Sequence, residues 1–145
     1  MRNYIFILIV IFISIGCKQN YDFEKDSEEA IELLKLELKL NNEESVEEVN
    51  YWKYNNDIVT RFRIKKHTAD RIKKNLNMHL NLSIEYIYIP EDSPTWFAPP
   101  MFDNTNNIYS SELKNRKKFL QYDELNDVYY YTNLKWSTKN WIAYN

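Results

Sequence analysis

The chain has 145 residues, with 19 basic and 21 acidic side chains, one glycine (Gly16) and one cysteine (Cys17). A chain of this length forms one domain, and without further glycines it cannot build the phosphate-binding loops of nucleotide-dependent enzymes. A single thiol excludes an intramolecular disulfide, a zinc–thiolate site and an iron–sulfur cluster, so we expect no cofactor.

The first 17 residues have the pattern of an export signal. Residues 1–3 carry one positive charge, and residues 4–13 form an unbroken apolar run that ends at Ser14. A membrane-spanning helix needs roughly 20 apolar residues, whereas a signal peptide has a shorter apolar region of this kind. We therefore expect export rather than a permanent transmembrane helix.

The segment Ser14-Ile15-Gly16-Cys17 resembles the lipobox of bacterial lipoproteins, except that Ser14 replaces the usual aliphatic residue. The resemblance implies cleavage before Cys17 and diacylation of that cysteine, and two or three acyl chains give stable anchoring. Lys18 stands where an aspartate is often linked to inner-membrane retention, which favours the outer membrane. The alternative is an ordinary secretory signal or an uncleaved anchor, in which Cys17 has no role.

The domain organisation follows from this anchor. We expect residues 1–16 to be the signal peptide, residues 17–25 a lipidated tether, and residues 26–145 a single domain. The lipid would hold this domain in the cell envelope, at the periplasmic face of the outer membrane or at the cell surface. We expect this domain to be a monomer.

The mature chain begins with a predicted helix. Ser27 is a suitable N-cap residue, and Ile31, Leu34 and Leu38 recur at helical spacing. Asparagine is second only to glycine as a left-handed C-cap residue, so Asn41 and Asn42 are predicted to end this helix.

Strands and a second helix are predicted next. Residues 46–54 and 58–64 read as a hairpin around Asn55-Asn56-Asp57, since Asn and Asp supply the left-handed turn positions in a chain without glycine. In the second of these strands one face is expected to be core and the other largely solvated. Thr68 is then predicted to cap a helix that runs to about His79, and residues 82–89 predict a strand.

The remainder of the chain predicts a long loop and a second hairpin. Residues 90–107 show no periodicity and contain all four prolines, while residues 119–122 and 128–136 predict two strands, and residues 141–144 a last short element. The sum is an α+β, two-layer fold, with an antiparallel sheet of about five strands and two helices packed on one face.

The mature domain is similar to small uncharacterised exported bacterial lipoproteins. The similarity rests on the segment Pro94-Thr95-Trp96-Phe97-Ala98-Pro99, which has a Pro-x-Trp-aromatic-x-Pro pattern, and on a closing hairpin rich in tyrosine. It implies an exported domain and no particular activity.

Trp96 and Phe97 are the first candidate binding residues. Flanking prolines reduce the entropy lost when a loop engages a ligand, and tryptophan is a common interface anchor. The alternative is that the two rings plug the open side of the core.

Arg61 and Arg63 are the second candidate pair. Residues 50–80 hold eight basic and two acidic side chains, whereas residues 17–49 hold four basic and eleven acidic ones. Two arginines on one strand face could bind an anionic saccharide, a phosphate-bearing polymer or an acidic protein, or could simply form a solvated surface. Nucleic acid is not expected, because the exported domain is net acidic.

No catalytic or metal site is predicted. His67 and His79 stand in no metal-ligand spacing, and paired carboxylates such as Glu91 and Asp92 are typical of solvated loops. We therefore expect a non-catalytic binding module for a protein or an envelope glycan. The alternative is a small envelope hydrolase of glycan or peptide that uses Glu91, Asp92 or an unassigned serine and histidine.

Overall fold

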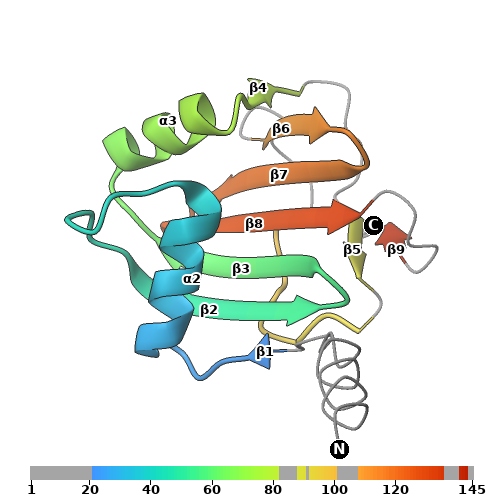
Figure 1. Cartoon of the computed structure of the whole chain (residues 1–145), viewed down its shortest axis with the longest axis horizontal. Coiled ribbons are helices and arrows are strands. Elements are labelled where there is room, and N and C mark those ends of the chain that lie inside the picture. Colours follow the sequence, from blue (N-terminus) through green and yellow to red (C-terminus); the bar gives the residue numbers. More distant parts are fainter. Residues whose placement is uncertain (1–20, 82–87, 91, 101–107, 136–140, 144–145) are drawn as a thin grey trace, which may run out of the picture.

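The sheet is the centre of the structure (Figure 1). This computed structural model describes residues 21–81, 88–90, 92–100, 108–135 and 141–143. Its helices are α2 (Glu28–Leu38) and α3 (Lys66–Asn75). Its strands are β1 (Tyr21–Asp22), β2 (Glu47–Tyr54), β3 (Asp57–Arg63), β4 (His79–Leu80), β5 (Tyr88–Pro90), β6 (Ile108–Leu113), β7 (Arg116–Asp123), β8 (Val128–Lys135) and β9 (Trp141–Ala143).

Seven of the described strands form one sheet in the order β1-β2-β3-β8-β7-β6-β4, while β5 and β9 form a separate pair. Every pairing is antiparallel. The α+β class is therefore confirmed, but the sheet is larger than the five strands expected. Strands β1 and β4 have two residues each, too few to show alternation. In β6 the run Ser110-Ser111-Glu112 interrupts the alternation of apolar and polar residues by which a strand is predicted.

The first hairpin forms as the sequence predicts. Asn55 and Asn56 have φ values of 50° and 72°, so both occupy the left-handed region that a tight hairpin turn requires. Asparagine tolerates this region better than most residues. The turn sets the register in which Tyr54 pairs with Asp57 and Trp52 pairs with Val59.

Helix α2 starts where the sequence predicts and ends earlier. The side chain of Ser27 accepts a hydrogen bond from the backbone N–H of Ala30 at 3.3 Å. The helix ends at Leu38 rather than at Asn41, because Lys39 adopts the left-handed conformation and the N–H of Leu40 bonds back to the carbonyl of Lys35. Such a closure satisfies the last carbonyls of a helix without glycine.

Helix α3 and the next predicted strand also differ from expectation. The helix starts at Lys66, and Thr68, the predicted cap, is a buried residue of its first turn. The helix ends at Asn75, so His79 lies in β4 instead. Of the strand predicted at 82–89, residues 82–87 lie outside the described residues, and β5 contains the remainder.

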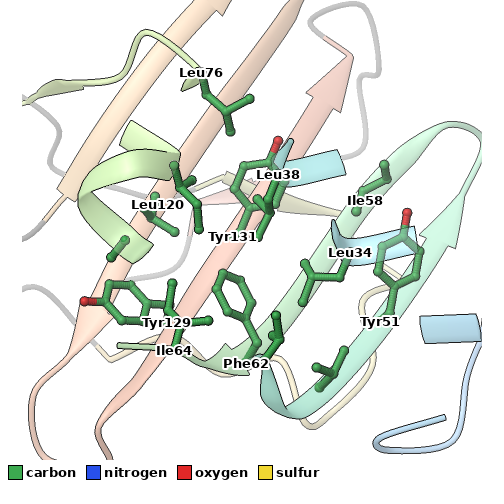
Figure 2. Packing of buried hydrophobic residues seen from close by; sticks show 14 of the residues in the cluster. Leu34, Leu38, Tyr51, Ile58, Phe62, Ile64, Leu76, Leu120, Tyr129 and Tyr131 are labelled. Carbon is green, nitrogen blue, oxygen red and sulfur yellow. The ribbon is translucent and has the colours of Figure 1, made fainter. Parts of the chain in front are cut away.

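Both helices pack on one face of the sheet, as predicted. Figure 2 shows Leu34 and Leu38 of α2 against the aromatic rings of Tyr51, Phe62 and Tyr131. Ala69 and Ile72 of α3 belong to the same buried cluster. This is the main core.

The opposite face of the sheet carries a second core, so the prediction that strand 58–64 has a solvated face is wrong. Val59 points away from the helices and packs with Trp52, Val128 and Tyr130. Residues 88–90 and 92–100 pass behind the sheet in Figure 1, and their Ile89 and Phe97 complete this cluster. The sequence pattern missed it because the covering residues lie about 30 positions further along the chain.

A half-buried carboxylate helps to fix α2 on the sheet. Glu37 Oε1 accepts hydrogen bonds of 2.6 Å from the hydroxyl of Tyr131 and from the side-chain amide of Asn133, and Lys118 Nζ lies 3.4 Å away. Burial, followed by the charge of Glu37, raises the pKa of Tyr131 well above its ordinary value. The phenol therefore stays protonated and donates to the carboxylate.

The fold includes residues that the sequence assigned to a tether. Tyr21 and Asp22 pair with Lys53 and Trp52 at the edge of the sheet, and the ring of Phe23 lies 6.1 Å from that of Tyr51. Residues 21–23 therefore belong to the domain. The expected start at residue 26 is too late because a two-residue strand has no periodicity to detect.

Leu34 and Leu36 provide a matched test of this packing. Leu34 is fully buried, whereas Leu36 is 76% exposed on the same helix. We expect Leu34→Ala to lower the free energy of unfolding by about 2 to 5 kcal/mol, through lost transfer energy and the cavity left behind. Leu36→Ala should change it by less than about 0.5 kcal/mol. Urea denaturation of both variants measures the difference, and equal losses would contradict the placement of α2.

Candidate functional site

Trp96 and Phe97 lie against the second core. Phe97 is only 3% exposed, and its ring meets that of Tyr130 at a centroid distance of 5.5 Å in an edge-to-face arrangement. Trp96 is partly buried and lies edge-to-face with Phe97 at 5.9 Å. A ligand could reach the ring of Phe97 only if the loop moved. The geometry is that of a cover over the sheet.

Arg61 and Arg63 are brought to a common carboxylate. Arg63 Nη1 forms a hydrogen-bonded ion pair with Glu48, and Arg61 Nη1 lies 3.8 Å from the other oxygen of the same group. Arg63 also donates to the carbonyls of Asn126 and Asp127, each at 3.1 Å. The carboxylates of Glu48 and Asp127 therefore offset part of the positive charge of the two arginines within the domain.

A backbone irregularity makes this pairing possible. The register between β2 and β3 shifts between Glu47 and Asn50, and Glu48 has a φ of 52°. A bulge of this kind redirects a side chain and bends the strand. Here it accompanies the placement of the Glu48 carboxylate between two arginines and Lys25, whose Nζ lies 3.7 Å away.

The two predicted pairs share a neighbour. Arg61 is the direct partner of Tyr130 in the β3–β8 register, and Phe97 packs on Tyr130. The structure thus brings Arg61 and Phe97 to the same face of the sheet, but as parts of a packed layer.

In the described residues, the two histidines and Asp92 do not come together as a catalytic or metal site. His67 and His79 are both exposed, one in α3 and the other in β4. Asp92 is exposed, and Glu91 lies outside the described residues. Among the residues described, no group of three or more histidine, cysteine, aspartate or glutamate side chains could hold a metal ion.

A cleft that the sequence analysis did not single out lies between α3 and the ends of β6, β7 and β8. We name it the tyrosine cleft, and its volume is about 450 Å³. Its lining residues are Ile64, Lys66, Lys73, Tyr109, Leu120, Tyr122, Glu124, Asp127 and Tyr129. Ile64, Leu120 and Tyr129 join it to the main core, and in Figure 2 the hydroxyl of Tyr129 points away from the middle of that core.

Hydrogen bonds and ring contacts order the walls of the cleft. The rings of Tyr122 and Tyr129 lie 4.8 Å apart, and the hydroxyl of Tyr122 donates to Asp127 Oδ1 at 2.8 Å. Lys73 Nζ lies 4.3 Å from the centre of the Tyr109 ring and 2.6 Å from Asp70 Oδ1. These contacts fix three aromatic side chains around one opening.

Tyr122 and Tyr129 of the cleft remain neutral at physiological pH. Burial raises the pKa of Tyr129 to about 12, and the hydrogen bond to Asp127 raises the pKa of Tyr122. On the adjoining helix, the hydrogen bond from Lys73 lowers the pKa of Asp70. A protonated phenol donates and accepts hydrogen bonds but is a poor nucleophile. These two side chains can therefore exchange hydrogen bonds with a bound molecule but are poorly suited to nucleophilic attack.

A neighbouring groove extends the tyrosine cleft. Its volume is about 410 Å³, and it shares Ile64, Lys66 and Asp127 with the cleft before reaching Glu47 and Arg63. Arg63, proposed from the sequence as a binding residue, therefore lies at the margin of this larger surface rather than at its centre.

The sequence contains a signal for part of the cleft. Tyr122 and Tyr129 flank the second predicted hairpin, and the observed register places them directly opposite each other. Counting residues outward from the turn along both strands would have paired Tyr122 with Tyr129. Tyr109 comes from β6, which the sequence did not reveal, and its place beside Lys73 depends on how α3 crosses the sheet.

Comparison with known protein families, with curated proteins and with solved structures finds no match for the chain. In the described part of the chain, no helix is long and apolar enough to span a membrane.

Phe97 and Trp96 allow the covering role of the loop to be measured. We expect Phe97→Ala to lower the free energy of unfolding by about 3 to 5 kcal/mol, because it empties a buried site. Trp96→Ala should cost less, since that ring is only partly covered. Guanidinium denaturation of both variants tests this order. A stable Phe97→Ala variant would show that the loop is not part of the core.

Proposed function

We propose that the chain is a lipid-anchored, non-catalytic binding protein of the bacterial cell envelope, and that the tyrosine cleft is its ligand site. The observation that carries this proposal is the convergence of Tyr109, Tyr122 and Tyr129 on one opening with charged groups at its rim. The ligand is a protein segment or an envelope glycan.

The chemistry of the cleft suits both kinds of ligand. Tyrosine supplies a large contact area with few rotatable bonds, so little conformational entropy is lost on binding. Its ring can pack on an apolar surface while its hydroxyl bonds to a polar group. Lys66 and Glu124 place opposite charges on the rim, which fits a ligand with both donors and acceptors better than a simple anion.

The anchor is proposed from the amino-terminal sequence. The lipobox-like segment ends at Cys17, and the described fold begins with β1 at Tyr21. A lipid on Cys17 would hold the domain close to the bilayer with few intervening residues, so the sheet edge at β1 would be the nearest part of the domain to the membrane. We propose the outer membrane on the basis of Lys18.

The alternative of a small envelope hydrolase has less support. Neither His67 nor His79 lines the tyrosine cleft, and a general base must lie within hydrogen-bond reach of the group that it deprotonates. The two carboxylates of the cleft do not act as a pair. Asp127 accepts a hydrogen bond from the hydroxyl of Tyr122, whereas Glu124 lies on the rim.

The lipid anchor is tested by Cys17→Ser. We expect this variant to lose fatty-acid incorporation and to leave the membrane fraction, because the thiol is the acceptor of the acyl chains. Metabolic labelling with a fatty acid, followed by cell fractionation, measures both effects. Label retained by the serine variant would contradict the lipobox assignment.

The tyrosine cleft is tested by Tyr122→Ala. We expect binding to weaken by about 2 kcal/mol, roughly 30-fold, if Tyr122 is an interface anchor. The probes are purified peptidoglycan sacculi, for a glycan ligand, and proteins captured from native membranes, for a protein ligand.

Two further variants complete the design. Tyr122→Phe keeps the ring and removes only the hydrogen bond to Asp127, so a smaller loss is expected. Tyr54→Ala is the matched control, because Tyr54 is another partly exposed tyrosine that stacks on Trp52 rather than lining the cleft. Equal binding by Tyr122→Ala and the wild type would contradict the proposed site.

A further inference from the structure

The outer surface of α2 combines apolar and acidic side chains. A hollow of about 650 Å³ opens there, and Ile31, Leu36 and Leu40 form its apolar part. Asp26, Glu28 and Glu32 line it as well. None of these residues lines the tyrosine cleft, so this surface is a separate feature of the domain.

Within the apolar part, Leu36 is not needed to hold α2 on the sheet. Ala30, Leu34 and Leu38 are fully buried and supply the contact with the main core. Leu36 is exposed, and Leu40 is only partly covered. A helix that only covers a sheet needs one apolar stripe. On α2 the exposed Leu36 extends the apolar surface outward, beside the half-buried Ile31 and Leu40, which also pack against the main core.

Two carboxylates of the acidic part, Glu28 and Glu32, are uncompensated within the described residues, whereas Asp26 Oδ1 accepts a hydrogen bond of 2.7 Å from the backbone N–H of Val49. Glu37, Glu44 and Glu48 each contact a lysine or arginine. By contrast, no hydrogen bond or ion pair joins the carboxylates of Glu28 or Glu32 to another side chain in the described part of the chain.

Helix stability accounts for only some of these groups. The helix dipole favours the carboxylate of Glu28 in the first turn, but its effect falls off before Glu32. The cation of the hollow, Lys35, is turned toward the backbone, where its Nζ donates to the carbonyl of Asn42 at 2.8 Å. The surface therefore keeps a negative field beside exposed leucine.

We propose that this surface binds a basic amphipathic segment of a partner protein. Its apolar side chains would fill the hollow between Ile31, Leu36 and Leu40, and its lysines or arginines would pair with Glu28 and Glu32. Charge complementarity selects this occupant, since the same carboxylates repel anionic lipid headgroups and a second copy of α2. Burial of leucine supplies affinity, while the carboxylates set orientation and partner choice.

The test uses an amphipathic helical peptide of leucine and lysine as the probe. The full chain is incorporated in nanodiscs of zwitterionic lipid, with empty nanodiscs as the blank, and fluorescence anisotropy of the labelled peptide gives the dissociation constant. We expect the double variant Glu28→Gln, Glu32→Gln and the variant Leu36→Ser each to weaken binding by about tenfold. Binding to the wild type should also weaken as salt is added.

A charge-matched variant separates this surface from general electrostatic attraction. Glu112→Gln combined with Asp92→Asn removes the same two negative charges at exposed positions outside both the α2 surface and the tyrosine cleft, and should leave peptide affinity within about twofold of the wild type. Equal weakening by both double variants would overturn the proposal, as would unchanged binding by Leu36→Ser.

Self-association provides the remaining outcome. Leu36 is exposed, so Leu36→Ser is expected to fold, and thermal unfolding confirms this. If analytical ultracentrifugation shows that the wild type dimerises and Leu36→Ser does not, then a second copy occupies the surface and the proposal of a basic partner is overturned. A monomeric wild type that binds the peptide through α2 supports it.

Discussion

The burial of β3 and β8 on both faces is the constraint on which the rest of the structure depends. Phe62 and Tyr131 face the helices, whereas Val59 and Tyr130 face the opposite layer. A sheet buried on both sides needs two covering layers. Helices α2 and α3 supply one, and the segment around Ile89 and Phe97 supplies the other. Loss of either cover would expose a row of aromatic side chains to water.

This constraint redistributes the residues that looked functional in the sequence. Phe97 is used as a cover, and Arg61 lies beside Tyr130 in the same layer, where it shares the Glu48 carboxylate with Arg63. The two surfaces that we propose for recognition lie at the periphery. One is the tyrosine cleft, where the sheet extends beyond the cover of α3, and the other is the outward surface of α2.

The two surfaces differ in chemistry. In the tyrosine cleft, two of the four charged side chains are already engaged, as Asp127 is with Tyr122 and Lys73 is with Asp70. In the proposed binding role, directional hydrogen bonds and ring contacts would therefore act together with the charges of Lys66 and Glu124. On α2 the carboxylates of Glu28 and Glu32 have no such engagement in the described structure, so long-range charge attraction would contribute more. A protein with both surfaces could hold an envelope component and a basic partner independently.

The sequence by itself determined the local elements. The Ser27 cap, the Leu34 and Leu38 stripe, the Asn55-Asn56 turn and the second hairpin follow from propensities and periodicities within a few residues. The short edge strands β1 and β4 were not predicted, because two residues are too few to show the alternation of a strand. Only the tertiary structure decided the sheet order, the second core and the tyrosine cleft. Each joins residues far apart in the chain, as Tyr109 and Lys73 show, and such contacts depend on how the layers pack rather than on local pattern.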